Sequence, residues 1–123
     1  MTKPTILVID DSELCLELTR DVLEDAGFVV ITSESADDAR ALIDHARPAC
    51  IVLDVSMPSV RGDSLVAHLR GSGGLQVPIV LHSAMPLAEL TALARTSGAA
   101  GAASKSHDGA DLIVAIRDLL ARG

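Results

Sequence analysis

The stretch Thr5-Ile6-Leu7-Val8-Ile9-Asp10-Asp11 decides the fold of this chain. Its apolar and β-branched residues follow one another without alternation, which is typical of a strand buried on both faces of a sheet. The run ends abruptly at two adjacent carboxylates, so this acidic pair is expected at the carboxyl end of the strand. A strand of this kind needs a covering layer on each side, and helices provide that layer in α/β proteins.

Four further strands are expected, at residues 28–32, 49–53, 77–82 and 99–104. The last is weak by propensity because it is short and rich in alanine. Polar residues come directly after three of these four runs, and they are Asp54, Ser83 and Lys105. The pattern of the first strand, an apolar run followed directly by a polar residue, is therefore repeated along the chain.

Amphipathic helices are expected between and after the strands, at residues 12–26, 35–46, 63–70, 86–98 and 108–120. In the first of them, Leu14, Leu18 and Val22 recur every four residues, and Cys15 and Leu23 widen this stripe. We expect this stripe to be the buried face of the helix. Gly27 supplies a stop signal at its end.

Regular alternation of strands and helices predicts a doubly wound α/β fold with a five-stranded parallel sheet and helices on both faces. The expected strand order is the flavodoxin-like 2-1-3-4-5. In such sheets ligands bind outside the carboxyl ends of the strands. We therefore expect the acidic pair and the three later polar residues to lie at that edge. These five residues are Asp10, Asp11, Asp54, Ser83 and Lys105.

The composition bounds the protein class. The chain has 123 residues, of which 49% are apolar, so we expect one domain over residues 1–123. A formal net charge of -7 argues against direct binding of nucleic acid. No apolar run reaches the roughly 18 residues of a membrane span and no signal peptide is recognisable, which predicts a cytoplasmic protein without membrane insertion. The only aromatic residue is Phe28, and both Cys15 and Cys50 are expected to be buried thiols.

Three carboxylates that converge within a few ångströms repel one another unless a cation lies among them, and oxygen ligands of this type suit Mg²⁺. If the pair Asp10 and Asp11 stood alone, a solvated loop or a helix N-cap would be the better explanation. The coincidence of five polar residues at one edge favours a site. A lysine and a hydroxyl can hold phosphoryl oxygens, and an ionised Asp54 can attack phosphorus to give an aspartyl phosphate.

These residues resemble the receiver domain of two-component response regulators over essentially the whole chain. The motifs that carry the resemblance are Val8-Ile9-Asp10-Asp11-Ser12, Leu53-Asp54-Val55-Ser56-Met57-Pro58, Gly62, Leu81-His82-Ser83-Ala84 and Ser104-Lys105. The resemblance implies that Asp10 and Asp11 are the acidic metal pair, that Asp54 is the phosphoacceptor, and that Ser83 is the switch hydroxyl. It further implies that Lys105 pairs with the phosphate.

By the same resemblance, Ser56 offers its backbone carbonyl to Mg²⁺. The implied function is that of a stand-alone receiver, not an enzyme. It takes phosphate from a histidine kinase or a histidine phosphotransfer protein and signals by a conformational change to a downstream protein. The chain departs from the family at Ala102, where receivers usually carry a switch aromatic, and at Ser106, where they carry proline. We therefore expect weakened coupling to the surface around the fifth strand.

Three other functions remain open on the sequence. A pseudo-receiver would bind proteins without phosphate, which the changes at Ala102 and Ser106 favour. An aspartate-nucleophile phosphatase would carry a second carboxylate two residues after the nucleophile, where this chain has Ser56. A flavodoxin-like electron carrier would need aromatic residues to stack a flavin. His82, directly before Ser83, is expected to be a packed strand-end histidine rather than a group that titrates near neutral pH.

Overall fold

The computed structural model describes residues 3–55, 66, 77–105 and 108–122. Within these ranges the strands are β1 (Thr5–Ile9), β2 (Val29–Ser33), β3 (Cys50–Asp54), β4 (Ile79–Ser83) and β5 (Gly101–Ser104). The helices are α1 (Glu13–Asp25), α2 (Ala36–Ala46), α4 (Leu87–Ser97) and α5 (Ala110–Arg122). The helix expected at 63–70 lies outside the described residues except for Val66, which is helical and buried.

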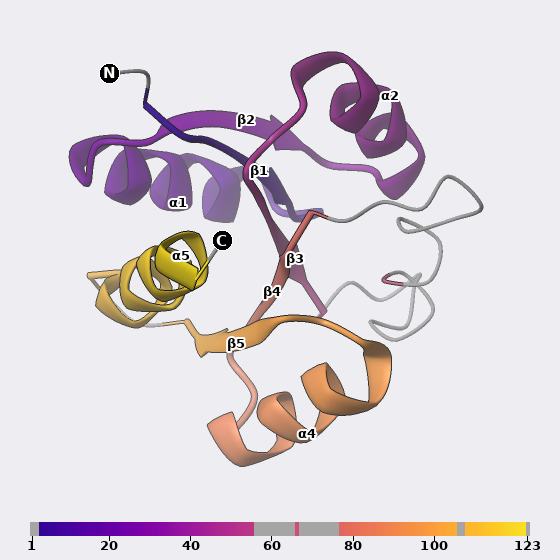
Figure 1. The fold of residues 1–123 in the computed structure, drawn as a ribbon, viewed down its shortest axis with the longest axis vertical. Helices are drawn as coiled ribbons and strands as arrows, with labels where there is room; N and C mark the ends of the chain where they lie inside the picture. Colours follow the sequence, from indigo (N-terminus) through magenta and orange to yellow (C-terminus); the bar gives the residue numbers. More distant parts are fainter. Residues whose placement is uncertain (1–2, 56–65, 67–76, 106–107, 123) are drawn as a thin grey trace.

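The strands form one parallel sheet in the order β2-β1-β3-β4-β5 (Figure 1). This confirms the predicted flavodoxin-like α/β fold. The strand order reverses between β1 and β3, and Asp10 follows β1 while Asp54 is the last residue of β3. The predicted switch point of the topology therefore carries two of the carboxylates.

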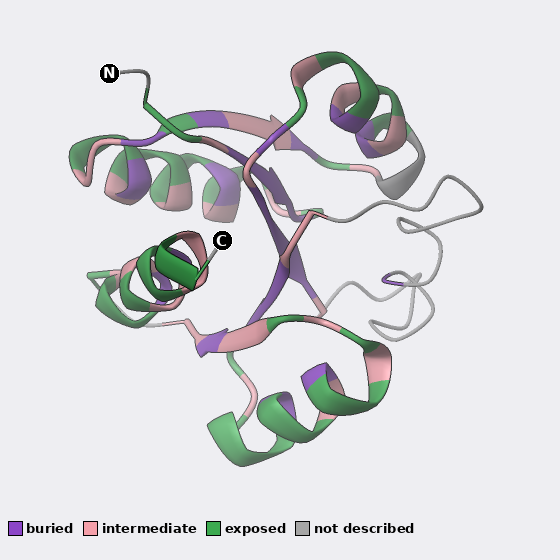
Figure 2. Ribbon diagram, viewed as in Figure 1, coloured by how far each residue is buried: buried purple, intermediate pink, exposed green. Residues whose placement is uncertain are grey.

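Helices cover both faces of the sheet (Figure 1). One core cluster joins the sheet to α2 and α4 and includes Leu7, Leu53 and Leu90. The other joins the sheet to α1 and α5 and includes Val8, Leu23, Val52, Leu112 and Ile116. The central strands are buried on both sides (Figure 2), which is why their sequences are unbroken apolar runs.

The buried face of α1 differs from the predicted stripe. Leu14 is 64% exposed and Leu18 is 57% exposed, whereas Leu16 and Leu23 are buried. Leu16 and Leu23 are seven residues apart and lie on the same side of the helix, while a spacing of four drifts by about 40° at each step. The predicted stripe was therefore wrong for Leu14 and Leu18, although Leu23 does belong to the buried side.

The weakest expected strand does form. β5 is only four residues long, but its register against β4 pairs Leu81 with Ala102 and Ser83 with Ser104. Pairing with a buried neighbouring strand compensates for the poor strand propensity of glycine and alanine. The backbone N–H of Lys105 extends this pairing by donating to the carbonyl of Ser83 at 2.9 Å.

None of the helices in the described part of the chain combines the length and the apolar character that spanning a bilayer would require.

Candidate functional site

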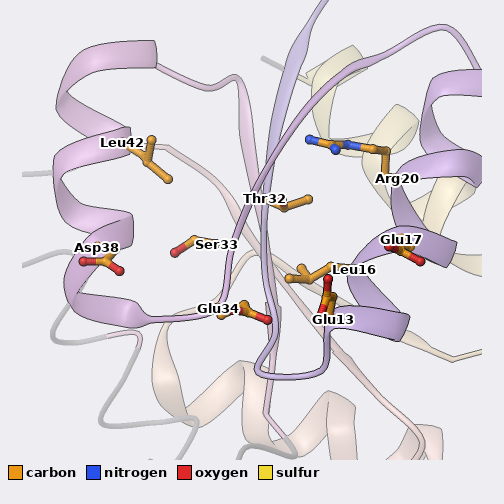
Figure 3. A pocket seen from close by; sticks show the side chains of 9 residues that line it. All are labelled: Glu13, Leu16, Glu17, Arg20, Thr32, Ser33, Glu34, Asp38 and Leu42. Atoms are coloured by element: carbon orange, nitrogen blue, oxygen red, sulfur yellow. The ribbon is translucent and has the colours of Figure 1, made fainter.

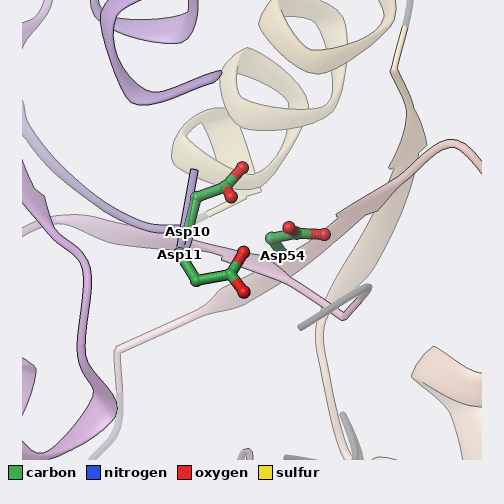
Figure 4. Close-up of side chains that lie close together, drawn as sticks. All are labelled: Asp10, Asp11 and Asp54. Atoms are coloured by element: carbon green, nitrogen blue, oxygen red, sulfur yellow. The ribbon is translucent and has the colours of Figure 1, made fainter. Parts of the chain in front are cut away.

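The three aspartates that the sequence singles out do converge. Carboxylate oxygens of Asp10, Asp11 and Asp54 all lie within 4.8 Å of one another (Figure 4). Asp10 is 2% exposed and Asp54 is 3% exposed, while Asp11 lies at the surface. The cluster is thus open to solvent on one side and enclosed by the sheet on the other.

Backbone contacts orient the acidic pair. The N–H of Asp10 donates to the carbonyl of Ser33 in β2 at 3.1 Å, and its carboxylate accepts from the N–H of Ser12 at 2.9 Å. Ser12 is also the N-cap of α1, since its hydroxyl accepts from the N–H of Cys15 at 3.3 Å. Because Ser12 is the N-cap of α1, neither Asp10 nor Asp11 has that role.

Lys105 reaches the aspartates from the other end of the chain. Its Nζ lies 3.2 Å from Oδ2 of Asp10 and 3.5 Å from Oδ2 of Asp54. The lysine side chain is 24% exposed, so its charge is partly shielded from water. One ammonium therefore lies close to two buried carboxylates, one directly after β1 and one at the end of β3.

The charges in this cluster are not balanced. Burial, followed by the neighbouring Asp54, raises the pKa of Asp10 above its usual value despite the hydrogen bond from Ser12 and the attraction of Lys105. Burial works to lower the pKa of Lys105, but Asp54 and Asp10 outweigh it, so that pKa is raised. Both pKa values are raised, which favours the neutral form of Asp10 and the charged form of Lys105. Three carboxylates and one ammonium leave an excess of negative charge, and this donor set fits a hard cation such as Mg²⁺.

Ser83 lies at the same edge. It is the last residue of β4, it is 1% exposed, and its hydroxyl accepts from the N–H of Met85 at 3.2 Å. Its backbone carbonyl also binds the N–H of Lys105. The structure therefore brings together Asp10, Asp11, Asp54, Ser83 and Lys105, while Ser56 lies outside the described residues.

His82 is packed inside the protein, as the sequence predicts. It is 6% exposed and is the register partner of Asp54 across β3 and β4. Burial, assisted by the charge of Lys105 and opposed by Asp54, lowers its pKa to about 4. The imidazole is thus neutral at pH 7.

Cys15 is a neighbour of the site that the sequence did not identify. Its Sγ lies 3.8 Å from Nζ of Lys105, and the residue is only half-buried. The prediction of two buried thiols is correct for Cys50 and wrong for Cys15. Cys15 lies in the first turn of α1, at the rim of the sheet, and only the approach of Lys105 from β5 shows that it borders the site.

A separate polar cavity of about 530 Å³ lies between α1, β2 and α2 (Figure 3). Its lining includes the acidic side chains Glu13, Glu17, Glu34 and Asp38 together with Arg20. None of the three clustered aspartates contributes to this lining. The candidate site is therefore distinct from this cavity.

Residues 6–117 match the family described as the response regulator receiver domain. The chain belongs to this family. It is accordingly a response regulator receiver domain of two-component signalling, with the acidic pocket of Asp10, Asp11 and Asp54 and with Lys105 beside it. A receiver domain is a signalling module that implies a kinase partner.

Curated relatives support the assignment. The chain is 31% identical to the transcriptional regulatory protein PrrA of Mycobacterium tuberculosis over 122 residues, which cover 99% of this chain and 52% of that protein. It is 28% identical to the polar-differentiation response regulator DivK of Brucella abortus over 88 residues, 71% of each chain. The chain thus spans about half the length of PrrA.

Solved structures share the fold over nearly the whole chain. The chemotaxis response regulator CheY4 of Vibrio cholerae is similar with a TM-score of 0.82 and 26% identity, covering 96% of this chain and 99% of that one. A two-component response regulator of the LuxR family from Aurantimonas is similar with a TM-score of 0.85 and 27% identity, covering 98% and 87%.

Of the two departures from the receiver pattern, Ala102 lies on β5, and Ser106 lies outside the described residues. Ala102 is half-buried beside the core cluster of α2 and α4. With Gly101 and Ala103 it lines a groove of about 500 Å³ that is bordered by Leu87 and by α5. The domain therefore has small side chains and a groove at the position where the resemblance leads us to expect a ring.

Proposed function

We propose that the domain is the phosphoacceptor of a two-component phosphorelay, and that Asp54 accepts the phosphoryl group from a histidine kinase or a histidine phosphotransfer protein. One observation carries the proposal: the buried Asp54 carboxylate lies 3.5 Å from Lys105 and within 4.8 Å of the two other aspartates. An ion pair alone needs one carboxylate for one ammonium. The additional acidic groups serve a cation and, with it, a phosphoryl group.

The chemistry of transfer follows from these positions. An Asp54 oxygen forms a bond to phosphorus while the phosphorus–nitrogen bond of the donor phosphohistidine breaks, and the imidazole of the donor leaves with the electron pair. Lys105 and the Ser83 hydroxyl hold the oxygens of the transferred group. The product is an aspartyl phosphate on Asp54.

Mg²⁺, when bound, neutralises charge that develops on the phosphoryl oxygens during transfer. Asp10, Asp11 and Asp54 would hold it, and the backbone carbonyl of Ser56 would add a ligand. Lys105 stays within reach of Asp54 and can follow the phosphoryl group as the charge on that carboxylate changes. The residues of the chain thereby bind and orient the group.

The proposal extends to the whole of residues 1–123 as one cytoplasmic domain. Phosphorylation then changes the conformation of the Ser83 segment, and a downstream protein reads the changed surface. The domain acts as a phosphoprotein switch rather than as an enzyme with its own substrate.

Labelling with acetyl phosphate tests the proposal. Wild-type protein in Mg²⁺ should gain one phosphoryl group by mass spectrometry, and Asp54→Ala should gain none. The matched control is Asp44→Ala, because Asp44 is exposed on α2 and belongs to no cluster described above. Chelation of Mg²⁺ by EDTA should abolish labelling of the wild type.

Equal labelling of Asp54→Ala and wild type would show that another residue is the acceptor. Labelling that survives EDTA would show that the acidic cluster does not act through a cation. A protein that is never labelled by acetyl phosphate or by any phosphorylated donor would instead be a pseudo-receiver, a binding module that works without phosphate.

A further inference from the structure

The Lys105 ammonium has a third partner besides the two buried carboxylates. Its Nζ lies 3.8 Å from Sγ of Cys15, 3.2 Å from Oδ2 of Asp10 and 3.5 Å from Oδ2 of Asp54. An ammonium has three N–H donors, and a cysteine sulfur is a weak acceptor. Cys15 lies in α1, Asp10 follows β1 and Asp54 ends β3, so three separate elements confine the end of a long and flexible side chain.

Cys15 is itself held in place by the start of α1. Its backbone N–H donates to Oγ of the N-cap residue Ser12 at 3.3 Å. The backbone N–H of the same Ser12 donates to Oδ1 of Asp10 at 2.9 Å. A cap contact of this kind stabilises the first turn of a helix, so the sulfur projects from an ordered turn beside the site.

These contacts close a ring around the buried carboxylate of Asp10. One of its oxygens accepts from the N–H of Ser12, and the other accepts from Nζ of Lys105. Cys15 contacts both Ser12 and Lys105 and thereby completes the ring. The positions of the acidic residue and of the lysine are therefore linked through the first turn of α1.

The three contacts of Lys105 respond differently to a cation in the acidic pocket. The oxygens of Asp10 and Asp54 would be shared between the cation and the ammonium, which repel each other. Mg²⁺ takes oxygen ligands, so it does not compete for the sulfur of Cys15. Of the three contacts, the one with Cys15 is therefore the least affected by the cation.

Packing alone gives Cys15 a smaller role. A free cysteine often serves as a small apolar side chain in a core. In this turn of α1 the buried residue is Leu16, which is 5% exposed, whereas Cys15 is half-buried and belongs to neither of the core clusters described above. Removal of the sulfur should therefore cost the fold little, and its effect on the site should act through Lys105.

We propose that Cys15 is a positioning residue for Lys105, because its sulfur accepts from the ammonium and keeps Nζ beside Asp54. This inference rests on the proposed function, in which Asp54 accepts the phosphoryl group and Lys105 holds its oxygens. It adds that the rate of phosphorylation depends on a side chain outside the cluster of three aspartates.

The rate of labelling by acetyl phosphate in saturating Mg²⁺ tests the proposal. Cys15→Ala should be labelled about threefold more slowly than the wild type, as expected for one lost weak hydrogen bond. Cys15→Ser keeps an acceptor and should recover most of the rate. In a Lys105→Met background, Cys15→Ala should cause no further decrease, because the two residues act as one unit. The matched control is Leu14→Ala, which changes a 64% exposed neighbour in the same turn and should be labelled like the wild type.

A second measurement needs no phosphorylation. The chain has two lysines, Lys3 and Lys105, and Lys3 is exposed, so protein labelled with ¹³C at lysine Cε gives one NMR signal from the site and one reference signal. In Mg²⁺ without a phosphodonor, Cys15→Ala should move the Lys105 signal toward that of Lys3, because the side chain gains freedom. Cys15→Ser and Leu14→Ala should leave it near the wild-type position.

The proposal is overturned if the Lys105 signal is the same in Cys15→Ala and in the wild type, or if Cys15→Ser is labelled as slowly as Cys15→Ala. It is also overturned if Cys15→Ala slows labelling as much in the Lys105→Met background as in the wild type. Absence of labelling in the wild type would instead contradict the proposed function of Asp54. The NMR signal of Lys105 would then still decide whether Cys15 holds the lysine.

Discussion

The carboxyl-end edge of the sheet and the β5 face of the same domain differ in how well they match the receiver pattern. At the edge, Asp10, Asp11, Asp54, Ser83 and Lys105 are all present and all meet. On the β5 face, the run Gly101–Ser104 has no large side chain, and an open groove of about 500 Å³ lies beside it. The residues that the resemblance to receivers implies for the site meet at this edge, while β5 carries only small side chains where the resemblance leads us to expect a ring.

In the proposed function, accepting the phosphoryl group and passing the change on to the surface depend on different interactions. Accepting a phosphoryl group needs a few charged side chains at fixed distances, and pairing of the strands sets these distances. Transmitting the change from the site to the surface needs a side chain that can occupy two positions. A small residue on β5 preserves the first task, because pairing of β5 with β4 still positions Lys105.

The largest expected effect is the pH dependence of stability that the buried His82 causes at the carboxyl-end edge. The pKa of His82 is about 4 in the folded protein, against an ordinary value of 6.5, so the unfolded chain takes up a proton first as the pH falls. Stability is therefore fully present above pH 6.5 and is lost between pH 6.5 and pH 4, by at most about 3 kcal/mol. His82→Leu should lack this loss in urea unfolding measured at pH 7, 5.5 and 4.

The exposed His45 serves as the comparison, since His45→Leu should keep the pH dependence of the wild type. If the free energy of unfolding of His82→Leu and of the wild type fell in parallel over this pH range, another group would cause the loss. Such a result would also show that water reaches His82 more freely than its burial indicates.

The second prediction concerns the charge excess at the edge. Mg²⁺ that binds only the folded state should stabilise it by about 2.7 kcal/mol at 100 times its dissociation constant, a rise in Tm of roughly 10 °C. Asp11→Asn should blunt this rise in a thermal melt, whereas Asp25→Asn, an exposed change at the end of α1, should not. An undiminished rise in Asp11→Asn would place the cation elsewhere.

The third prediction compares the two regions directly. With Mg²⁺ and beryllofluoride as a phosphate mimic, amide shifts should reach residues 83–86 and remain small over residues 99–115. No ring on β5 moves inward to carry the change further. Ala102→Phe adds a ring beside the groove and should extend the shifts toward β5 and α5.

Large wild-type shifts over residues 99–115 that disappear in Ser83→Ala would contradict this expectation. Such a result would show that backbone movement couples the edge to the β5 face without an aromatic side chain.

The smallest expected effect lies on α5 near the groove. The ion pair between Arg122 and Asp118 is 2.8 Å long, but the two side chains are 69% and 58% exposed. Arg122→Ala should therefore change the free energy of unfolding by less than about 0.5 kcal/mol. Chemical denaturation in low salt would measure it, and a loss above 1 kcal/mol would show that this face is held by charge more strongly than its exposure suggests.

The sequence determined the sheet and the chemical groups at its edge. Unbroken apolar runs indicate strands buried on both faces, and each run is followed by, or ends on, a polar residue such as Asp10, Asp54 or Lys105. Parallel strands place all their carboxyl ends at one edge, so order along the chain was enough to predict which side chains meet. The family resemblance rests on the same residues.

Only the tertiary structure decided which surfaces pack and which residues border the site. Local periodicity did not reveal that Leu16 rather than Leu14 faces the sheet, because two adjacent stripes of α1 are both apolar. The contact of Cys15 with Lys105 joins residues 90 positions apart, and the β5 strand exists because β4 pairs with it. Side-chain chemistry and short-range pattern are properties of the chain, whereas burial and long-range contact arise only when separate segments compete for the same core.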